Sequence, residues 1–170
     1  LKLGAPRDKV VYNCYGVDVE RFSSGRPAEA PPHFLAVGRF VNKKAPHLTV
    51  EAFRRVLAKR PDARLTMVGT GVLWESCARL VKALGLEQQV HLPGVLRPEA
   101  IADLFRNSRG FVQHSVVADN GDSEGTPLAV LEAMASGVPV VATAHAGIAD
   151  VVAHGEQGLL CAEHDVEAMA

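Results

Sequence analysis

The stretch FVQHSVVADNGDSEGTPLAVLEAMASGVPVVAT, residues 111–143, decides the fold because it joins two short apolar runs through a helical pattern. The first run is FVQ at 111–113 and the second is PVVA at 139–142. Between them, apolar side chains recur at three- and four-residue intervals, which predicts one buried helix face: Leu128, Leu131 and Ala135. A strand, a helix and a second strand in this order predict two parallel strands joined by a helical crossover.

The same alternation continues on both sides of this stretch. Two further helix faces are predicted by Val50, Phe53, Val56 and Leu57, and by Leu73, Cys77, Leu80, Val81 and Leu84. The other short runs that predict buried strands are FLAV at 34–37, LTMV at 65–68, VHL at 90–92 and LLC at 159–161. The sequence therefore predicts an α/β fold, a doubly wound parallel sheet with helices on both faces. Ligands of such folds bind beyond the carboxyl ends of the strands.

The N-terminal stretch has a different character. VVYNCYGVDVERF at 10–22 followed by SSGRPAEAPP at 23–32 predicts one strand, a turn and a proline-rich lead-in. The chain begins at Leu1 and stops inside the helical pattern DVEAMA at 165–170. We therefore expect a piece of a longer protein.

Length and composition narrow the class of protein. The 170 residues correspond to about one domain, and 48% hydrophobic with 22% charged residues is typical of a globular chain. The net charge of −1 argues against a dedicated nucleic-acid binder. Three widely spaced cysteines form no disulfide framework or CxxC pair, which favours a reducing compartment. The sequence shows neither an apolar run long enough to span a membrane nor a secretory leader.

The loop after FLAV carries two cations, Arg39 and Lys44, beside Gly38. Arginine presents a fork of donors that matches phosphate oxygens, and lysine adds a point charge. The pair could hold a diphosphate, and the alternative is a solvated turn before a helix.

The loop after LTMV contains Gly69 and Gly71, the opening of a dinucleotide-binding pattern. Trp74 stands where the third glycine belongs, and glutamines rather than an acid follow about twenty residues later. The loop could allow a ligand close to the backbone, or it could simply form a tight strand-to-helix turn.

The third loop carries Glu124 just before Pro127, where a helix is expected to begin. Free N–H groups at a helix N-terminus favour anions. Glu132 lies five residues into this helix, which places it roughly 7–8 Å along the helix axis from the start, at about 1.5 Å per residue. Two carboxylates flanking an anion site suit a ligand with hydroxyls on either side of a diphosphate. The alternatives are a helix-dipole partner for Glu124 and an exposed helix residue for Glu132.

Other kinds of site find no support. The acids at 119, 122 and 124 lack the spacing of a calcium loop. The seven histidines contain no HExxH and are expected to be surface or loop residues rather than ligands. A Ser-His-Asp triad stays open, although no GxSxG motif occurs. No aromatic and basic stripe for single-stranded nucleic acid is present.

The order of these motifs resembles the C-terminal half of a group 1, family-four glycosyltransferase over nearly the whole chain. Its most specific element is EGxPxxxxEAMASGxPVVAT, with seven residues between Glu124 and Glu132, and DNGDSEGTPL resembles bacterial colanic-acid and amylovoran enzymes. The other matching motifs are NCYGVDVERF at 13–22, FLAVGRFVNKKAP at 34–46, LTMVGTG at 65–71, VHLPGVL at 90–96 and GEQGLL at 155–160.

The resemblance implies one Rossmann-like half of a two-domain GT-B architecture, with residues 1–170 forming the nucleotide-sugar-binding C-terminal domain. The N-terminal acceptor domain and the final crossover helix would be absent. It implies a retaining enzyme that needs no metal or other cofactor and takes a nucleotide diphosphate sugar as substrate. The acceptor would be a saccharide or lipid-linked molecule held by the missing domain. The setting would be bacterial polysaccharide or glycolipid synthesis in the cytoplasm, with peripheral association at the inner face of the membrane.

The resemblance also assigns roles to residues. Arg39 and Lys44 would hold the diphosphate and support its departure, Glu132 would accept ribose hydroxyls, and Glu124 would contact the donor sugar. Further substrate contacts would come from Gly38, Gly69, Gly71, Gly94, Gly125, Thr126, Pro127 and Leu128, with residues 92–95 near the base.

Two departures from the family pattern stand out. Cys14 and Tyr15 separate Asn13 from Gly16, which puts an acceptor-side role of Asn13 in doubt, and Ala45 replaces the usual glycine after Lys44. Two other functions stay open: a nucleotide-sugar epimerase of the same architecture and a non-catalytic nucleotide-binding module.

Overall fold

The computed structural model describes residues 4–11, 13 and 15–170. It contains one six-stranded sheet in the order β3-β2-β1-β4-β5-β6, in which every pairing is parallel. The predicted doubly wound α/β fold is therefore confirmed, as are the six strands predicted from residue 34 onward. The strands are β1 (His33–Val37), β2 (Arg64–Val68), β3 (Val90–Gly94), β4 (Gly110–Gln113), β5 (Val140–Thr143) and β6 (Gly158–Cys161).

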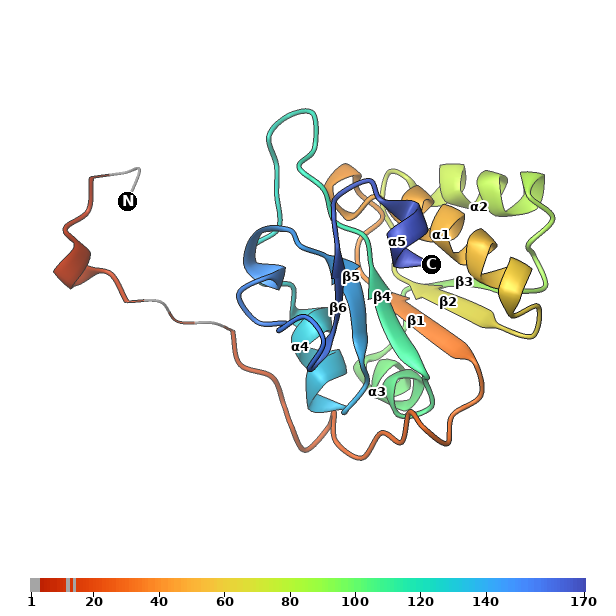
Figure 1. Ribbon diagram of the computed structural model, residues 1–170, viewed down its shortest axis with the longest axis horizontal. Coiled ribbons are helices and arrows are strands. Elements are labelled where there is room, and N and C mark those ends of the chain that lie inside the picture. The colour runs from red at the N-terminus through yellow and green to blue at the C-terminus, as the bar shows by residue number, and fades with distance from the viewer. Residues whose placement is uncertain (1–3, 12, 14) are drawn as a thin grey trace.

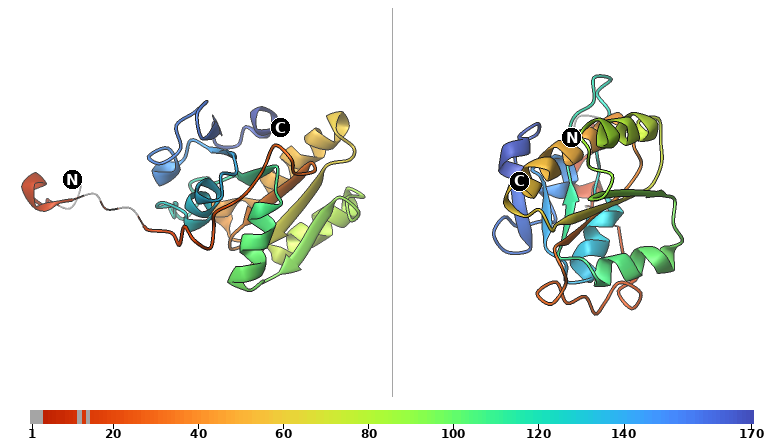
Figure 2. Two further views of the ribbon diagram at one scale, coloured as in Figure 1. Left: turned by 90° about the horizontal axis from the view of Figure 1, so that it is seen from below. Right: turned by 90° about the vertical axis from the view of Figure 1, so that its right-hand side faces the viewer.

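Helices cover both faces of the sheet, as Figure 2 shows in its right-hand view. The three predicted helix faces belong to α1 (Pro46–Lys59), α2 (Trp74–Ala83) and α4 (Leu128–Ala135). The expected C-terminal helix is α5 (Val166–Met169), and it begins where the Asp165 side chain accepts a hydrogen bond from the Ala168 N–H. A helix that the sequence analysis did not identify, α3 (Pro98–Arg106), follows β3. Figure 1 labels all five helices.

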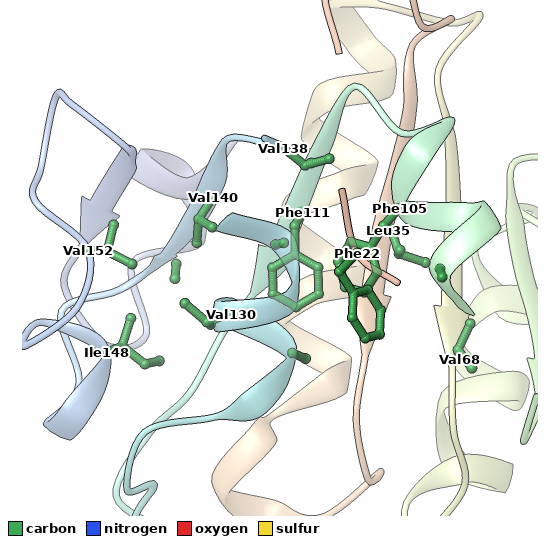
Figure 3. Close-up of a cluster of buried hydrophobic side chains, with 14 residues drawn as sticks. Phe22, Leu35, Val68, Phe105, Phe111, Val130, Val138, Val140, Ile148 and Val152 are labelled. Carbon is green, nitrogen blue, oxygen red and sulfur yellow. The ribbon is translucent and has the colours of Figure 1, made fainter. Parts of the chain in front are cut away.

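Two hydrophobic clusters, one on each face, hold the layers together. On one face Leu35 and Phe111 of the sheet pack against Phe105 of α3 and Val130 of α4 (Figure 3). On the other face Leu65 and other sheet residues pack against α1 and α2. Because side chains alternate along a strand, neighbouring residues of β1 join opposite clusters. This alternation explains why the strands are apolar runs without a polar face.

The N-terminal stretch does not form the predicted strand. Residues 10, 11, 13 and 15–22, the described part of that stretch, contain no strand, and the remaining two residues lie outside the described part of the chain. Phe22 is the point at which this segment joins the core, where its ring packs edge-on against Phe105. The described part of this apolar stretch pairs with no strand of the sheet and is irregular.

Cys77 and Cys161 are both free thiols. Cys77 is a buried residue of α2, and burial raises its pKa to about 11. Cys14, the third cysteine of the sequence, lies outside the described residues. Among the described residues, no helix has the length and apolar character needed to cross a membrane.

Candidate functional site

The strand order reverses between β1 and β4, and the main cleft lies beyond the carboxyl ends of these two strands. Ligands of open α/β sheets bind at this kind of reversal. The cleft has a volume of about 620 Å³. Its lining residues come from the loops after β1 and β4, from the start of α4 and from Tyr15 of the N-terminal segment.

Most of the residues predicted from the sequence meet in this cleft, and we call its two walls the cation loop (38–45) and the acidic loop (114–127). In Figure 1 the acidic loop, drawn in teal, projects beyond the sheet. The predicted residues that line the cleft are Gly38, Arg39, Lys44, Glu124, Gly125, Thr126, Pro127, Leu128 and Glu132. Three others, Gly69, Gly71 and Gly94, do not line it.

The cation loop places its lysines through a short 3-10 helix, Asn42–Lys44. The Lys44 side chain packs over Gly38: a Cβ atom added to that glycine would lie 3.4 Å from the lysine Cε. Ala45 follows in a left-handed conformation with φ of 35°, and α1 begins at Pro46. Left-handed backbone favours glycine, which gives a physical reason for a glycine after this lysine in the related pattern. In this chain Ala45 adopts that left-handed conformation.

Lys44 and Glu124 form an ion pair across the cleft, with 3.2 Å between Nζ and Oε2. Burial lowers the pKa of Lys44 by desolvating the ammonium, whereas Glu124 acts in the opposite direction and Lys43 and Arg39 lower it further. The Glu124 side chain is only 8% exposed. Its Oε1 has no hydrogen-bond partner among the described residues. The Glu124 side chain is therefore a buried acceptor beside two cations.

Lys43 also crosses the cleft, a contact that the sequence analysis did not predict. Its Nζ donates to Asp122 Oδ1 at 3.0 Å and to the Ser123 carbonyl at 3.1 Å, and lies 3.9 Å from Glu124 Oε1. The Val116 N–H donates to the Lys43 carbonyl at 2.9 Å. Lys43 thus ties the acidic loop to the cation loop through both its side chain and its backbone.

Glu132 projects from α4 into the cleft and is half-buried rather than fully exposed. Burial raises the pKa of Glu132 by penalising the carboxylate. The helix begins with Pro127 as its N-cap in an extended conformation. The structure gives this cap no side-chain hydrogen bond among the residues it describes. The first-turn N–H groups near Leu128 and Ala129, which both line the cleft, therefore remain available to an anion.

Gly69 and Gly71 both lie against the backbone of the cation loop. A Cβ on Gly69 would lie 2.0 Å from the Gly38 carbonyl oxygen, and one on Gly71 would lie 2.5 Å from that of Phe40. The two glycines therefore let the loop after β2 lie directly against the cation loop. The Gly69 N–H donates to the Gly94 carbonyl at 2.8 Å, which places Gly94 at the same sheet edge. The close approach seen here is between two segments of this chain, and the expected ligand contact of these glycines stays a prediction.

Two histidines near the ends of the acidic loop, His114 and His145, are buried although they lie outside the helices and strands. His114 is fully buried after β4, and its Nε2 accepts the His164 N–H at 3.0 Å. Burial, reinforced by His164 and His47, lowers the pKa of His114 to about 4. His145 is 2% exposed and contacts the backbone of Glu124. Among the described residues, no group of histidine, cysteine and acidic side chains is arranged to hold a metal.

Comparison with known proteins places the chain in a family. The family model described as "Glycosyl transferases group 1" matches residues 18–170. The putative colanic acid biosynthesis glycosyltransferase WcaL of Escherichia coli K12 is 36% identical, covering 99% of this chain and 42% of the relative. The amylovoran biosynthesis glycosyltransferase AmsK of Erwinia amylovora is 32% identical over 100% of this chain and 42% of its own length. The chain therefore spans about two fifths of these relatives.

Solved structures share the fold at lower identity. The C-terminal domain of the group 1 protein LpcC from Francisella tularensis has a TM-score of 0.75 and 24% identity, covering 91% of this chain and 84% of that domain. Anabaena HepE in complex with UDP-glucose has a TM-score of 0.80 and 21% identity, covering 99% of this chain and 48% of HepE. The fold is the Rossmann-like half of a GT-B architecture, as expected. The family match over most of its length shows that the chain belongs to the group 1 glycosyl transferases.

Proposed function

We propose that residues 1–170 form the donor-binding domain of a retaining glycosyltransferase. The enzyme moves a sugar from a nucleotide diphosphate sugar to a saccharide or lipid-linked acceptor. One observation carries the proposal: Arg39 and Lys44 line the same cleft as the uncapped N-terminus of α4. Membership of the group 1 family supports this chemistry.

The diphosphate is expected to lie between the cation loop and the first turn of α4. Arg39 and Lys44 supply charged donors to the phosphate oxygens, and the helix supplies backbone N–H groups. As the bond to the sugar breaks, negative charge grows on the leaving diphosphate. The same cations then stabilise the transition state, without requiring a metal.

The sugar and the ribose are expected on the acidic side of the cleft. Glu124 Oε1 is a buried acceptor suited to a sugar hydroxyl, because no hydrogen bond from the described residues already occupies it. Glu132, further along α4, would accept the ribose hydroxyls. The backbone from Gly125 to Leu128 would contact sugar and phosphate, and the base would lie near residues 92–95.

The biological setting is also part of the proposal. Relatives named for colanic acid and amylovoran biosynthesis support a role in bacterial polysaccharide or glycolipid synthesis. We place the enzyme in the cytoplasm, with peripheral association at the inner face of the membrane where lipid-linked acceptors reside. A second domain would hold the acceptor, so this chain alone should bind nucleotide but transfer little sugar.

A nucleotide panel followed by calorimetry tests the proposal. UDP, GDP and ADP are first screened for thermal stabilisation of this chain, because a ligand that binds the folded state raises its apparent stability. Affinity for the best nucleotide is then measured for the wild type, Arg39→Ala and Glu132→Ala. Loss of the charge-assisted bonds of Arg39 should weaken binding at least about tenfold.

The control is Arg79→Ala, which removes a 76% exposed arginine of α2 that does not line the cleft. Its nucleotide affinity should equal that of the wild type. The site assignment is wrong if Arg39→Ala and Glu132→Ala both bind as tightly as this control.

A further inference from the structure

The acidic loop must hold Glu124 at the cleft, yet it extends well beyond the sheet (Figure 1). We propose that His145, oriented by Glu163, is a positioning residue that fixes Glu124 for contact with the donor sugar. The inference rests on the proposed function of Glu124 and extends it to a pair outside the cleft lining.

The first contact joins His145 to Glu124, near the C-terminal end of the acidic loop. The backbone N–H of Glu124 donates to His145 Nε2 at 3.0 Å. His145 follows β5 and is the N-cap residue of a short 3-10 helix, Ala146–Ile148. Because it is 2% exposed and follows β5, an interior strand paired on both sides, its ring is a rigid support for the loop.

The second contact joins His145, through Glu163, to Val117 near the N-terminal end of the acidic loop. His145 Nδ1 lies 2.5 Å from Glu163 Oε1, and Glu163 Oε2 accepts the Val117 N–H at 2.9 Å. The pKa of Glu163 is lowered mainly because its carboxylate accepts this histidine hydrogen bond. One histidine–carboxylate pair therefore holds the loop at two points, Val117 and Glu124.

These partners permit one protonation state of the ring. Nε2 faces an amide N–H and must be an unprotonated acceptor, so Nδ1 carries the proton and donates to the carboxylate. His145 is then neutral and adds no cation beside Glu124. Within the described residues, the cationic partners of the Glu124 carboxylate are Lys43 and Lys44 of the cation loop. The backbone is fixed from behind while the side chain points to the cleft.

Binding measurements can separate positioning from general stability. We use UDP and UDP-glucose as probes. The sugar gain is defined as the dissociation constant of UDP divided by that of UDP-glucose, so that a larger gain means a larger contribution of the sugar to binding. A change in Glu124 position should reduce this ratio while leaving UDP affinity, which depends on Arg39, Lys44 and Glu132, within about threefold. A general loss of folding would weaken both ligands alike.

Two substitutions of His145 serve as a matched pair. His145→Gln places an acceptor near the former Nε2 and can keep the bond to the Glu124 N–H. His145→Asn resembles only the Nδ1 side and loses that bond. We expect Glu124→Gln and His145→Asn each to lower the sugar gain about tenfold, the size of one hydrogen bond to a charged group. His145→Gln should retain most of the gain.

The outcomes distinguish this inference from the proposed function. An unchanged sugar gain in Glu124→Gln refutes the assigned sugar contact, and the positioning role falls with it. A reduced gain in Glu124→Gln with wild-type gain in His145→Asn refutes the positioning role alone.

A ligand-free measurement decides the case if a variant does not fold. Long-range proton–nitrogen correlation of the wild-type imidazole at pH 7 should show His145 protonated at Nδ1 and bare at Nε2. The opposite tautomer, or a doubly protonated ring, would contradict the inference.

Discussion

The two walls of the cleft are built in different ways. The cation loop is held by backbone hydrogen bonds to the end of β2 and to the loop after it, among them Gly38 N–H to the Val68 carbonyl at 3.0 Å and Phe40 N–H to the Thr70 carbonyl at 2.9 Å. Apart from the bond that starts α4, from the Val130 N–H to the Pro127 carbonyl, the acidic loop has one such backbone bond to the rest of the described chain, from Val116 to Lys43. Its other attachments are side chains. The cation loop is thus part of the sheet framework, whereas the acidic loop is held mainly by a few side chains.

The walls also differ in charge. No lysine or arginine follows Arg109 in the sequence. Because β1 to β3 form one half of the sheet and β4 to β6 the other, this separation along the chain becomes a separation across the reversal point. Cations therefore come to the cleft from one side, and Lys43 and Lys44 reach across to the acidic loop.

Glycine substitutions should produce the largest difference between the walls. Gly69→Ala places a methyl group 2.0 Å from the Gly38 carbonyl oxygen at φ of +130°, and should cost about 3 kcal/mol or more of unfolding free energy. Gly121 of the acidic loop has φ of +79° with nothing within 4 Å of its added Cβ among the described residues. Gly121→Ala should therefore cost only about 1 kcal/mol.

Urea unfolding of both variants measures this comparison. The matched pair separates backbone strain, which both share, from the steric contact, which only Gly69→Ala introduces. Equal costs would show that the cation loop can move away from β2 and is not held as tightly as the backbone bonds indicate.

Removing the tie of Lys43 should have an intermediate effect. Lys43→Met keeps the aliphatic chain but loses the bonds to Asp122 and Ser123, at a cost of about 1 kcal/mol. Amide hydrogen exchange should accelerate from Val117 to Glu124 and remain unchanged in the cation loop. Lys82→Met, an exposed cation of α2, is the control and should change neither quantity. Faster exchange in both loops would contradict the difference between the walls.

Glu132→Gln should have the smallest effect on stability, with a definite dependence on pH. Burial raises the folded-state pKa of Glu132, so ionisation destabilises the folded state as pH rises through the unfolded and then the folded pKa. The variant should therefore be more stable than the wild type at pH 7, by less than about 1 kcal/mol because solvent screens a half-buried carboxylate. Thermal unfolding at pH 3.5 and 7 should show the gain shrinking at the lower pH. A gain that grows with acid would contradict the assigned cause.

Much of the fold and the cleft was predictable because the necessary signals are local. Short apolar runs between turn residues mark the strands, and helical spacing marks α1, α2 and α4. Since parallel strands end at one edge, the order of the loops was enough to bring Arg39, Lys44, Glu124 and Glu132 together. The short α3 was missed, although Pro98 marks its start and its apolar residues lie on one face.

The remaining features depend on contacts between distant residues. Gly69 and Gly71 have the pattern of a ligand loop, and only the packing of two loops shows that they face the chain's own backbone. His145 and Glu163 have no diagnostic spacing, because their pairing comes from neighbouring strand ends. Lys43 and Lys44 are adjacent residues of the same type, and only the structure shows that Lys43 also bonds to Asp122 and Ser123.

The central claim is that a nucleoside diphosphate binds between these two walls. Titration of the isotope-labelled chain with UDP, followed by amide resonances, tests it most directly. We predict that the largest shifts occur in residues 38–45 and 124–129, with small changes at the far ends of the strands. Saturable shifts confined to other parts of the molecule, with both loops unmoved, would contradict the account.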